Sequence, residues 1–109
     1  MNLRLYLLQR ATAAIMAPLV LAHVAVIFYA TGRGLSAAAI LARTRGSIGW
    51  GLFYALFVAA ASIHGAIGLR VVVSEWTPLR GPLLTILPWS FGLVLGALGM
   101  RAVTAVIAP

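Results

Sequence analysis

The fold is decided by the stretch HGAIGLRVVVSEW, residues 64–76, which closes a long apolar segment. It places a histidine deep inside that segment, then an arginine, and then the chain's only acidic residue, Glu75. Ionisable groups are costly inside hydrocarbon, so those that occur there usually face a protein interior, a cofactor or an ion path. We therefore interpret this stretch as the end of a membrane-spanning helix that carries function.

The composition is that of an integral membrane protein. Of the 109 residues, 63% are hydrophobic and 8% are charged, and the mean hydropathy is +1.09. In soluble domains about a quarter of the residues are charged. A chain of this length forms one domain, residues 1–109. The absence of cysteine excludes disulfides, thiolate metal sites and iron–sulfur ligation within the chain.

The net charge of +7 comes from arginines, opposed only by Glu75. They lie singly or in pairs near the ends of the apolar segments, which favours contact with phospholipid headgroups. No basic run is interleaved with aromatic residues, so the sequence does not indicate nucleic-acid binding. The arginines divide evenly between the two sides of the membrane, so their count leaves the orientation open.

We predict an all-α membrane protein with three transmembrane helices, over residues 10–31, 47–74 and 83–108. Each is close to the roughly 20 residues needed to cross a bilayer, and the first is too long for the apolar core of a secretory signal. Residues 1–9 form a short amphipathic segment that leads into the first span. Residues 32–46 connect the first two spans and contain a short interfacial helix. Three spans put the termini on opposite sides of the membrane.

Small residues punctuate the spans. Gly32 and Gly34 end the first helix, Ser36 caps the interfacial helix, and Pro18 introduces a kink into the first span. Small residues at helical spacing let membrane helices approach closely. They are Gly51, Ala55 and Ala59 in the second span, and Gly92, Gly96 and Gly99 in the third.

Two histidines, His23 and His64, lie inside the predicted spans, without cysteine and without an intramembrane carboxylate. This inventory argues against a proton-driven transporter and leaves too few ligands for a zinc or di-iron site. A six-coordinate haem needs only two axial imidazoles, and its flat apolar ring fits between helices. Haem is therefore the cofactor that we expect.

The depth of the two histidines leaves two haem arrangements open. Counting from Arg10 and from Trp76 puts both roughly 18–20 Å from the same interface. Either both face one haem within the chain, or His64 pairs with a histidine of a partner chain. Gly68, one turn after His64, leaves room for a porphyrin ring or serves ordinary helix packing. Alternatively, either histidine is an interior group hydrogen-bonded to a carbonyl.

Four further residues have two interpretations each, one as ordinary contacts with the membrane interface and one as part of a functional site. Arg10 and Arg70 can each bind a haem propionate or a lipid phosphate. Glu75 and Trp76 are a helix-end carboxylate beside an interfacial aromatic. Alternatively, they form a quinone pocket in which Trp76 donates a hydrogen bond and Glu75 delivers protons.

The stretch from His64 to Trp76 resembles the second-helix pattern of the membrane-anchor subunits of succinate dehydrogenase and fumarate reductase, roughly His-x-x-x-Gly-(Leu/Ile/Met)-x-x-x-x-x-Asp-Tyr. The opening of the first helix, LQRATA at residues 8–13, is similar to the Arg-Ala-Thr-Ala opening of such anchors, especially the small cytochrome b anchor. The likeness covers the first two helices and the three-span layout. The third helix contributes no motif.

The resemblance implies a role for individual residues. His64 falls at the axial ligand of haem b, whose second ligand usually comes from another anchor subunit, and Arg10 falls near the haem propionates. Glu75 and Trp76 fall where the family tends to have Asp and Tyr beside the quinone, although tryptophan lacks the acidity of a phenol. His23 has no counterpart in the pattern of the small cytochrome b anchor, but relatives with two haems use a first-helix histidine.

The resemblance also implies partners and a location. The chain is then a non-catalytic anchor of a succinate:quinone oxidoreductase of the tricarboxylic acid cycle and electron transport. It docks an iron–sulfur subunit attached to a flavoprotein, in the inner or cytoplasmic membrane, with its N-terminus cytoplasmic. Two alternatives from other classes are a cofactor-free structural or assembly membrane protein and a small transporter subunit.

Overall fold

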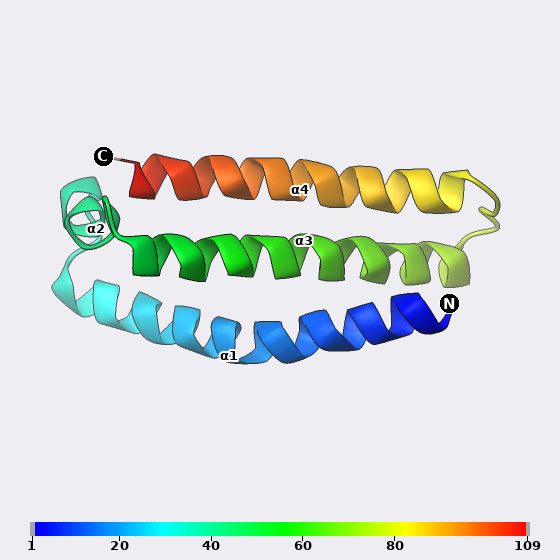
Figure 1. Ribbon diagram of the computed structural model, residues 1–109, viewed down its shortest axis with the longest axis horizontal. Coiled ribbons are helices and arrows are strands. Elements are labelled where there is room, and N and C mark those ends of the chain that lie inside the picture. The colour runs from blue at the N-terminus through cyan, green and yellow to red at the C-terminus, as the bar shows by residue number, and fades with distance from the viewer. Residues whose placement is uncertain (1, 109) are drawn as a thin grey trace.

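The computed structural model describes residues 2–108, which form helices and no strand. The helices are α1 (Leu3–Arg33), α2 (Ala37–Thr44), α3 (Ile48–Trp76) and α4 (Leu83–Ile107). Three of them, α1, α3 and α4, are long and apolar enough to cross a membrane. Figure 1 shows α3 between α1 and α4, with the start of α1 and the end of α4 at opposite ends of the bundle. The predicted all-α fold with three spans is confirmed.

The first span begins earlier than predicted. The side-chain oxygen of Asn2 accepts a hydrogen bond of 2.9 Å from the N–H of Leu5. Asn2 is thus the N-cap of α1, which begins within residues 1–9, the segment predicted to precede the first span. At the other end Gly34, with φ 111°, is the C-cap, as predicted, but Gly32 lies inside the helix. Pro18 also lies within α1, which bends near its middle in Figure 1.

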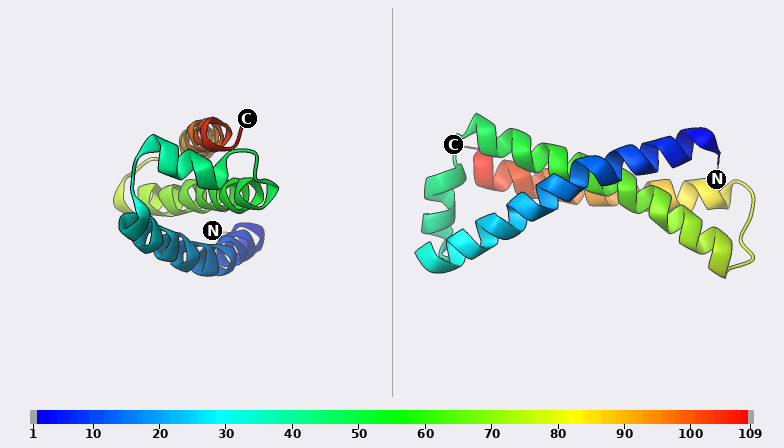
Figure 2. Two further views of the ribbon diagram at one scale, coloured as in Figure 1. Left: turned by 90° about the vertical axis from the view of Figure 1, so that its left-hand side faces the viewer. Right: turned by 90° about the horizontal axis from the view of Figure 1, so that it is seen from below.

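The connection between α1 and α3 closes one end of the bundle. Ser36 caps the predicted short helix, α2, through its side chain, and Figure 2 shows α2 lying across the bundle end. The hydroxyl of Thr44 lies 2.8 Å from the carbonyl oxygen of Val106, and the N–H of Gly46 donates to the carbonyl of Ile107 at 2.7 Å. These bonds satisfy carbonyls that the end of α4 would otherwise leave without a partner.

Helices α3 and α4 approach closely through the glycines of α4. A Cβ atom added at Gly92 would lie 2.8 Å from the Cβ of Ala66, and one added at Gly99 would lie 2.6 Å from Val58 Cγ1. Both distances are shorter than real Cβ contacts, so only glycine permits this spacing. Ala66 and Ile67 have no exposed surface. The predicted packing role of the α4 glycines is confirmed.

The outer surface of the bundle is apolar. Large side chains such as Leu21, Phe28 and Leu93 are more than two thirds exposed, at 72%, 75% and 75%. The molecule measures 48 × 22 × 22 Å, and its long axis is near the roughly 40–45 Å of a bilayer with its headgroups. A surface of this kind faces lipid or other membrane chains, as expected of a multi-pass membrane protein.

Candidate functional site

His64 of α3 is held by two side chains of α1. Its Nδ1 atom lies 3.2 Å from the hydroxyl oxygen of Thr12, and its backbone carbonyl accepts a hydrogen bond of 3.2 Å from Gln9 Nε2. Thr12 is only 4% exposed, and His64 is half-buried. Gln9 and Thr12 are three residues apart and therefore share one face of their helix. That face fixes both the ring and the backbone of a single residue of α3.

The other ring nitrogen of His64 is free. Within residues 2–108, Nε2 makes no hydrogen bond, and it is not among the fully buried polar atoms that lack a partner. It therefore reaches the surface of the chain. A half-buried imidazole with one nitrogen anchored and the other free can bind a group that approaches from outside the chain.

Gly68 faces α1. A Cβ atom added there would lie 3.5 Å from Gln9 Nε2, which is ordinary van der Waals contact. On the side that faces α1, the space beside Gly68 is therefore filled by Gln9, and the haem interpretation of Gly68 stays a prediction. This geometry matches the packing interpretation of Gly68.

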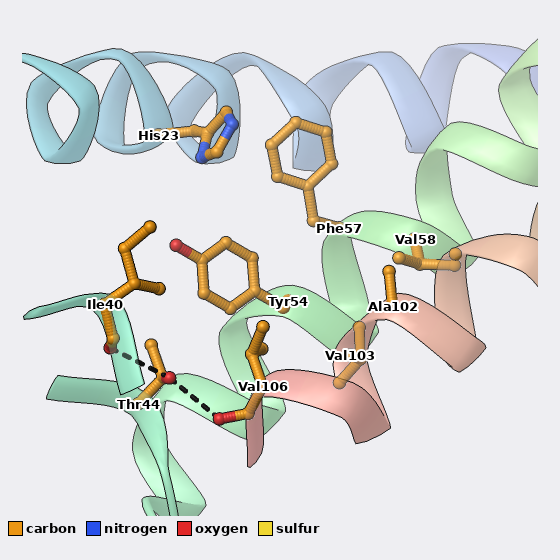
Figure 3. A pocket seen from close by; sticks show the side chains of 10 residues that line it. His23, Ile40, Thr44, Tyr54, Phe57, Val58, Ala102, Val103 and Val106 are labelled. Carbon is orange, nitrogen blue, oxygen red and sulfur yellow. Dashed lines mark hydrogen bonds between the residues drawn. The ribbon is translucent and has the colours of Figure 1, made fainter. Parts of the chain in front are cut away.

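His23 lies in a different, aromatic environment, shown in Figure 3. Its ring packs edge-on against Phe57 and Tyr54, with centroid distances of 5.3 Å and 5.9 Å. Its Nδ1 atom is buried without a hydrogen-bond partner among the described residues, so the carbonyl bond considered for a packing histidine is not formed by this nitrogen. The ring borders a cavity of about 330 Å³, otherwise lined by Ile40, Thr44, Tyr54, Phe57, Val58, Gly99, Ala102, Val103 and Val106.

The expectation that the two histidines lie at equal depth is wrong. His64 lies level with Thr12, whereas His23 lies level with Phe57, about 10 Å from His64 along α3. The prediction assumed that Arg10 and Trp76, at the end of α3, lie at the same membrane interface. Because α1 starts earlier and crosses α3, its Arg10 lies deeper than predicted. In this structure the two rings therefore have separate neighbours, Thr12 of α1 beside His64 and Phe57 of α3 beside His23.

The remaining predicted residues, Arg10, Arg70, Glu75 and Trp76, are half-buried or exposed. Arg10 is exposed, and its guanidinium lies 5.9 Å from the Tyr6 ring centroid. Arg70 is half-buried on α3. Trp76 is 82% exposed at the end of α3, and Glu75 beside it is also exposed. Glu75 and Trp76 lie about two helical turns beyond Gly68 along α3. Gly68 itself lies level with Gln9 and therefore near the level of Arg10.

Sequence reasoning missed Gln9 and Thr12 as site residues. The motif LQRATA contains both, but it pointed only to a family likeness and to Arg10. A usable signal was present: apart from Arg10, they are the only strongly polar side chains of this part of an apolar helix, and they share a face. Polar groups placed in this way usually meet a partner inside the bundle.

The fold and this contact define a class: a three-span membrane protein whose first helix anchors a histidine of its central helix. Over residues 2–97, from the N-cap of α1 into α4, the chain matches the family model of the succinate dehydrogenase/fumarate reductase transmembrane subunit. The chain belongs to this family. No curated protein and no solved structure matches it. Membership makes the chain a membrane subunit that associates, in the lipid bilayer, with the other subunits of such an enzyme.

Proposed function

We propose that this chain is the haem b-binding, quinone-site-forming membrane anchor of a succinate:quinone oxidoreductase. In that complex, electrons from succinate pass through a flavoprotein and an iron–sulfur subunit to quinone in the membrane. The observation that carries the proposal is the free Nε2 of an anchored His64 in a chain of this family. The chain itself performs no catalysis alone.

The side chains available fit a haem better than a bare metal ion. Among the described residues, no three His, Cys, Asp or Glu side chains come together, whereas structural and catalytic zinc sites need three or four protein ligands. A b-type haem would need only two imidazoles from the protein and would supply one-electron chemistry when bound. His64 offers one such imidazole.

The second axial ligand in this proposal comes from another chain. His23 packs against Phe57, about 10 Å along α3 from His64, and this separation supports a second ligand from outside the chain. The free Nε2 of His64 opens to the surface of the chain. A second membrane-anchor subunit, packed in the bilayer against that surface, supplies the other imidazole.

Two arginines are proposed to hold the haem propionates. Arg70 follows His64 on α3 by about 9 Å of helical rise, and Arg10 lies next to Gln9, which contacts the His64 carbonyl. A guanidinium binds a carboxylate through two parallel hydrogen bonds. Phosphate groups of lipids offer the same chemistry, so these side chains bind lipid where the propionates do not reach.

The end of α3 is proposed to form one wall of a quinone site. In this site the indole N–H of Trp76 donates a hydrogen bond to a quinone carbonyl, and the carboxyl group of Glu75 delivers protons. Both side chains are exposed, so the rest of the site comes from partner chains. Arg10, nearer to His64, contributes from the haem side. In this proposal, which follows the family resemblance, the N-terminus and this end of α3 lie on the cytoplasmic side of the membrane.

The test compares two histidine variants in the purified complex. His64→Ala should abolish the reducible low-spin b-type haem spectrum, because it removes an axial ligand. The matched control, His23→Ala, should leave that spectrum unchanged. A reducible low-spin b-type band that survives His64→Ala would remove His64 as the ligand, and loss of the band in His23→Ala instead would move the ligand to α1.

The same preparations separate the two alternatives. A cofactor-free structural or assembly protein predicts no haem band in the wild-type complex. A small transporter subunit predicts substrate flux in vesicles that contain this chain alone. We expect a haem band in the complex and no flux from the isolated chain.

A further inference from the structure

We infer that Thr12 is a positioning residue for the haem ligand: its buried hydroxyl holds the His64 imidazole as the Nδ1–H tautomer and leaves Nε2 as the metal-binding nitrogen. This inference rests on the proposed function, since it concerns the haem bound at His64. It adds a role for a residue of α1 that contacts Nδ1, the ring nitrogen that would not bind the iron.

The direction of the hydrogen bond follows from the contacts of the Thr12 hydroxyl. Its oxygen lies 3.0 Å from the carbonyl oxygen of Leu8 and 3.0 Å from that of Gln9. Carbonyl oxygens only accept, so the single hydroxyl proton is shared between them. If it pointed to Nδ1 instead, both contacts would become unfavourable approaches of two lone pairs. The hydroxyl therefore accepts at the third contact, the 3.2 Å contact with His64 Nδ1, and Nδ1 carries a proton.

The tautomer determines what the free nitrogen can do. In a neutral imidazole, protonation of Nδ1 leaves the lone pair on Nε2, which is the atom without a partner in the described part of the chain. An imidazole that donates from its second nitrogen is oriented and made a stronger ligand by the acceptor. Thr12 is 4% exposed, so water does not compete for its hydroxyl.

Gln9 holds the backbone that carries this ring. Its Nε2 donates to the His64 carbonyl at 3.2 Å and lies over Gly68, where any larger residue would bring a Cβ atom to 3.5 Å. The Gln9 bond and the Thr12 bond come from one face of α1. Together they limit both translation of α3 and rotation of the imidazole, which is the pre-organisation that a ligand needs.

The test replaces Thr12 in the intact complex. Thr12→Val keeps the shape of the side chain and removes the acceptor, Thr12→Ser keeps the hydroxyl, and Thr12→Cys keeps a weak acceptor. The matched control is Thr31→Val, because the Thr31 hydroxyl also donates to a carbonyl of α1, that of Ile27, but contacts no histidine. The readouts are the rate of haem loss to a scavenger protein and the haem midpoint potential.

We expect Thr12→Val to lose haem about 10- to 100-fold faster, the usual effect of removing an outer partner of a metal ligand. We also expect its midpoint potential to rise, because a less basic imidazole stabilises ferric iron less. Thr12→Ser and Thr31→Val should behave as the wild type, with Thr12→Cys between Ser and Val. If Thr12→Val does not assemble, the difference between Cys and Ser decides.

Three results would overturn the inference: wild-type haem loss and potential in Thr12→Val, equal behaviour of Thr12→Cys and Thr12→Ser where Val does not assemble, or an equal change in Thr31→Val. The last would show a general effect of removing a threonine from α1. Failure of the proposed function is recognised separately, by haem that survives His64→Ala.

Discussion

At the scale of single residues, the two histidines of this apolar bundle have different hydrogen-bonding environments. His64 has one nitrogen bonded to Thr12 and the other free. The Nδ1 atom of His23 is buried without a partner beside an apolar cavity. Among the described residues, Nε2 of each histidine makes no hydrogen bond and is not fully buried, so the difference between the two rings lies at Nδ1, which has a partner only in His64. The environment, more than the residue type, therefore favours His64 for the axial-ligand role.

The residues at the end of α3 carry a second prediction at this scale. Trp76→Leu or Glu75→Gln should slow quinone reduction by the complex about 10-fold or more, because each removes a hydrogen-bonding or proton-transferring group from the proposed quinone wall. Succinate oxidation measured with an artificial dye should be unchanged, because the dye takes electrons before the membrane. The check is the ratio of the two activities, and an equal loss of both would count against a quinone site here.

The sequence was sufficient to single out His64 but not its partners. An ionisable residue in a long apolar run is visible in the sequence, and so was the family pattern around it. The contact of His64 with Thr12 and Gln9 depends on how α1 slides along α3. That register is a tertiary property, because each helix satisfies its own backbone and fixes no position against its neighbour. The depth count from Arg10 failed for this reason.

At the scale of helices, α3 is the element on which the others assemble. Figure 2 shows α1 crossing α3; α1 meets His64 through Thr12 and meets Phe57 and Tyr54, further along α3, through His23. The α4 helix packs along α3 through Gly92 and Gly99. One helix thus presents a polar contact on one side and a tight apolar seam on another.

Substitution within that seam should destabilise the bundle. In Gly92→Ala, the added Cβ would lie 2.8 Å from the Cβ of Ala66 and 3.1 Å from the backbone oxygen of Ser62. Neither atom belongs to a flexible side chain, so α3 and α4 must separate, at a cost of about 1–3 kcal/mol. The control is Gly32→Ala in α1, where no atom lies within 4 Å.

We expect unfolding of Gly92→Ala, followed by circular dichroism in detergent, at a lower temperature than the wild type. Gly32→Ala should unfold at the wild-type temperature or above it, because alanine favours a helix by up to about 1 kcal/mol over glycine. Wild-type stability in Gly92→Ala would show that the seam is looser than the contact distances indicate.

The helices themselves were largely predictable, because twenty or so apolar residues in a row leave few other structures open. The Ser36 cap and the α4 glycines were correctly assigned from the same local rules. The start of α1 was missed because Asn2 caps a helix whose first turns carry polar groups outside the apolar run. Local capping decided that boundary, and hydropathy did not indicate it.

At the scale of the whole molecule, a single chain is too thin to enclose a cofactor. The bundle is 22 Å across in both short directions. In the most apolar stretch of each of α1, α3 and α4, only 6–17% of the residues are buried inside the chain. His64 Nε2, Glu75 and Trp76 all open to the surface. Each proposed site is therefore half of a site, completed by the partner subunits that family membership implies.

The most direct test of the central claim, that this chain supplies one axial imidazole through His64, exchanges the ligand instead of deleting it. His64→Met in the intact complex should convert a bis-imidazole haem into one with histidine and methionine ligands. Its absorption spectrum should change accordingly and its midpoint potential should rise, as methionine ligation does in c-type cytochromes. A His64→Met complex that keeps the wild-type haem spectrum and potential would contradict the account.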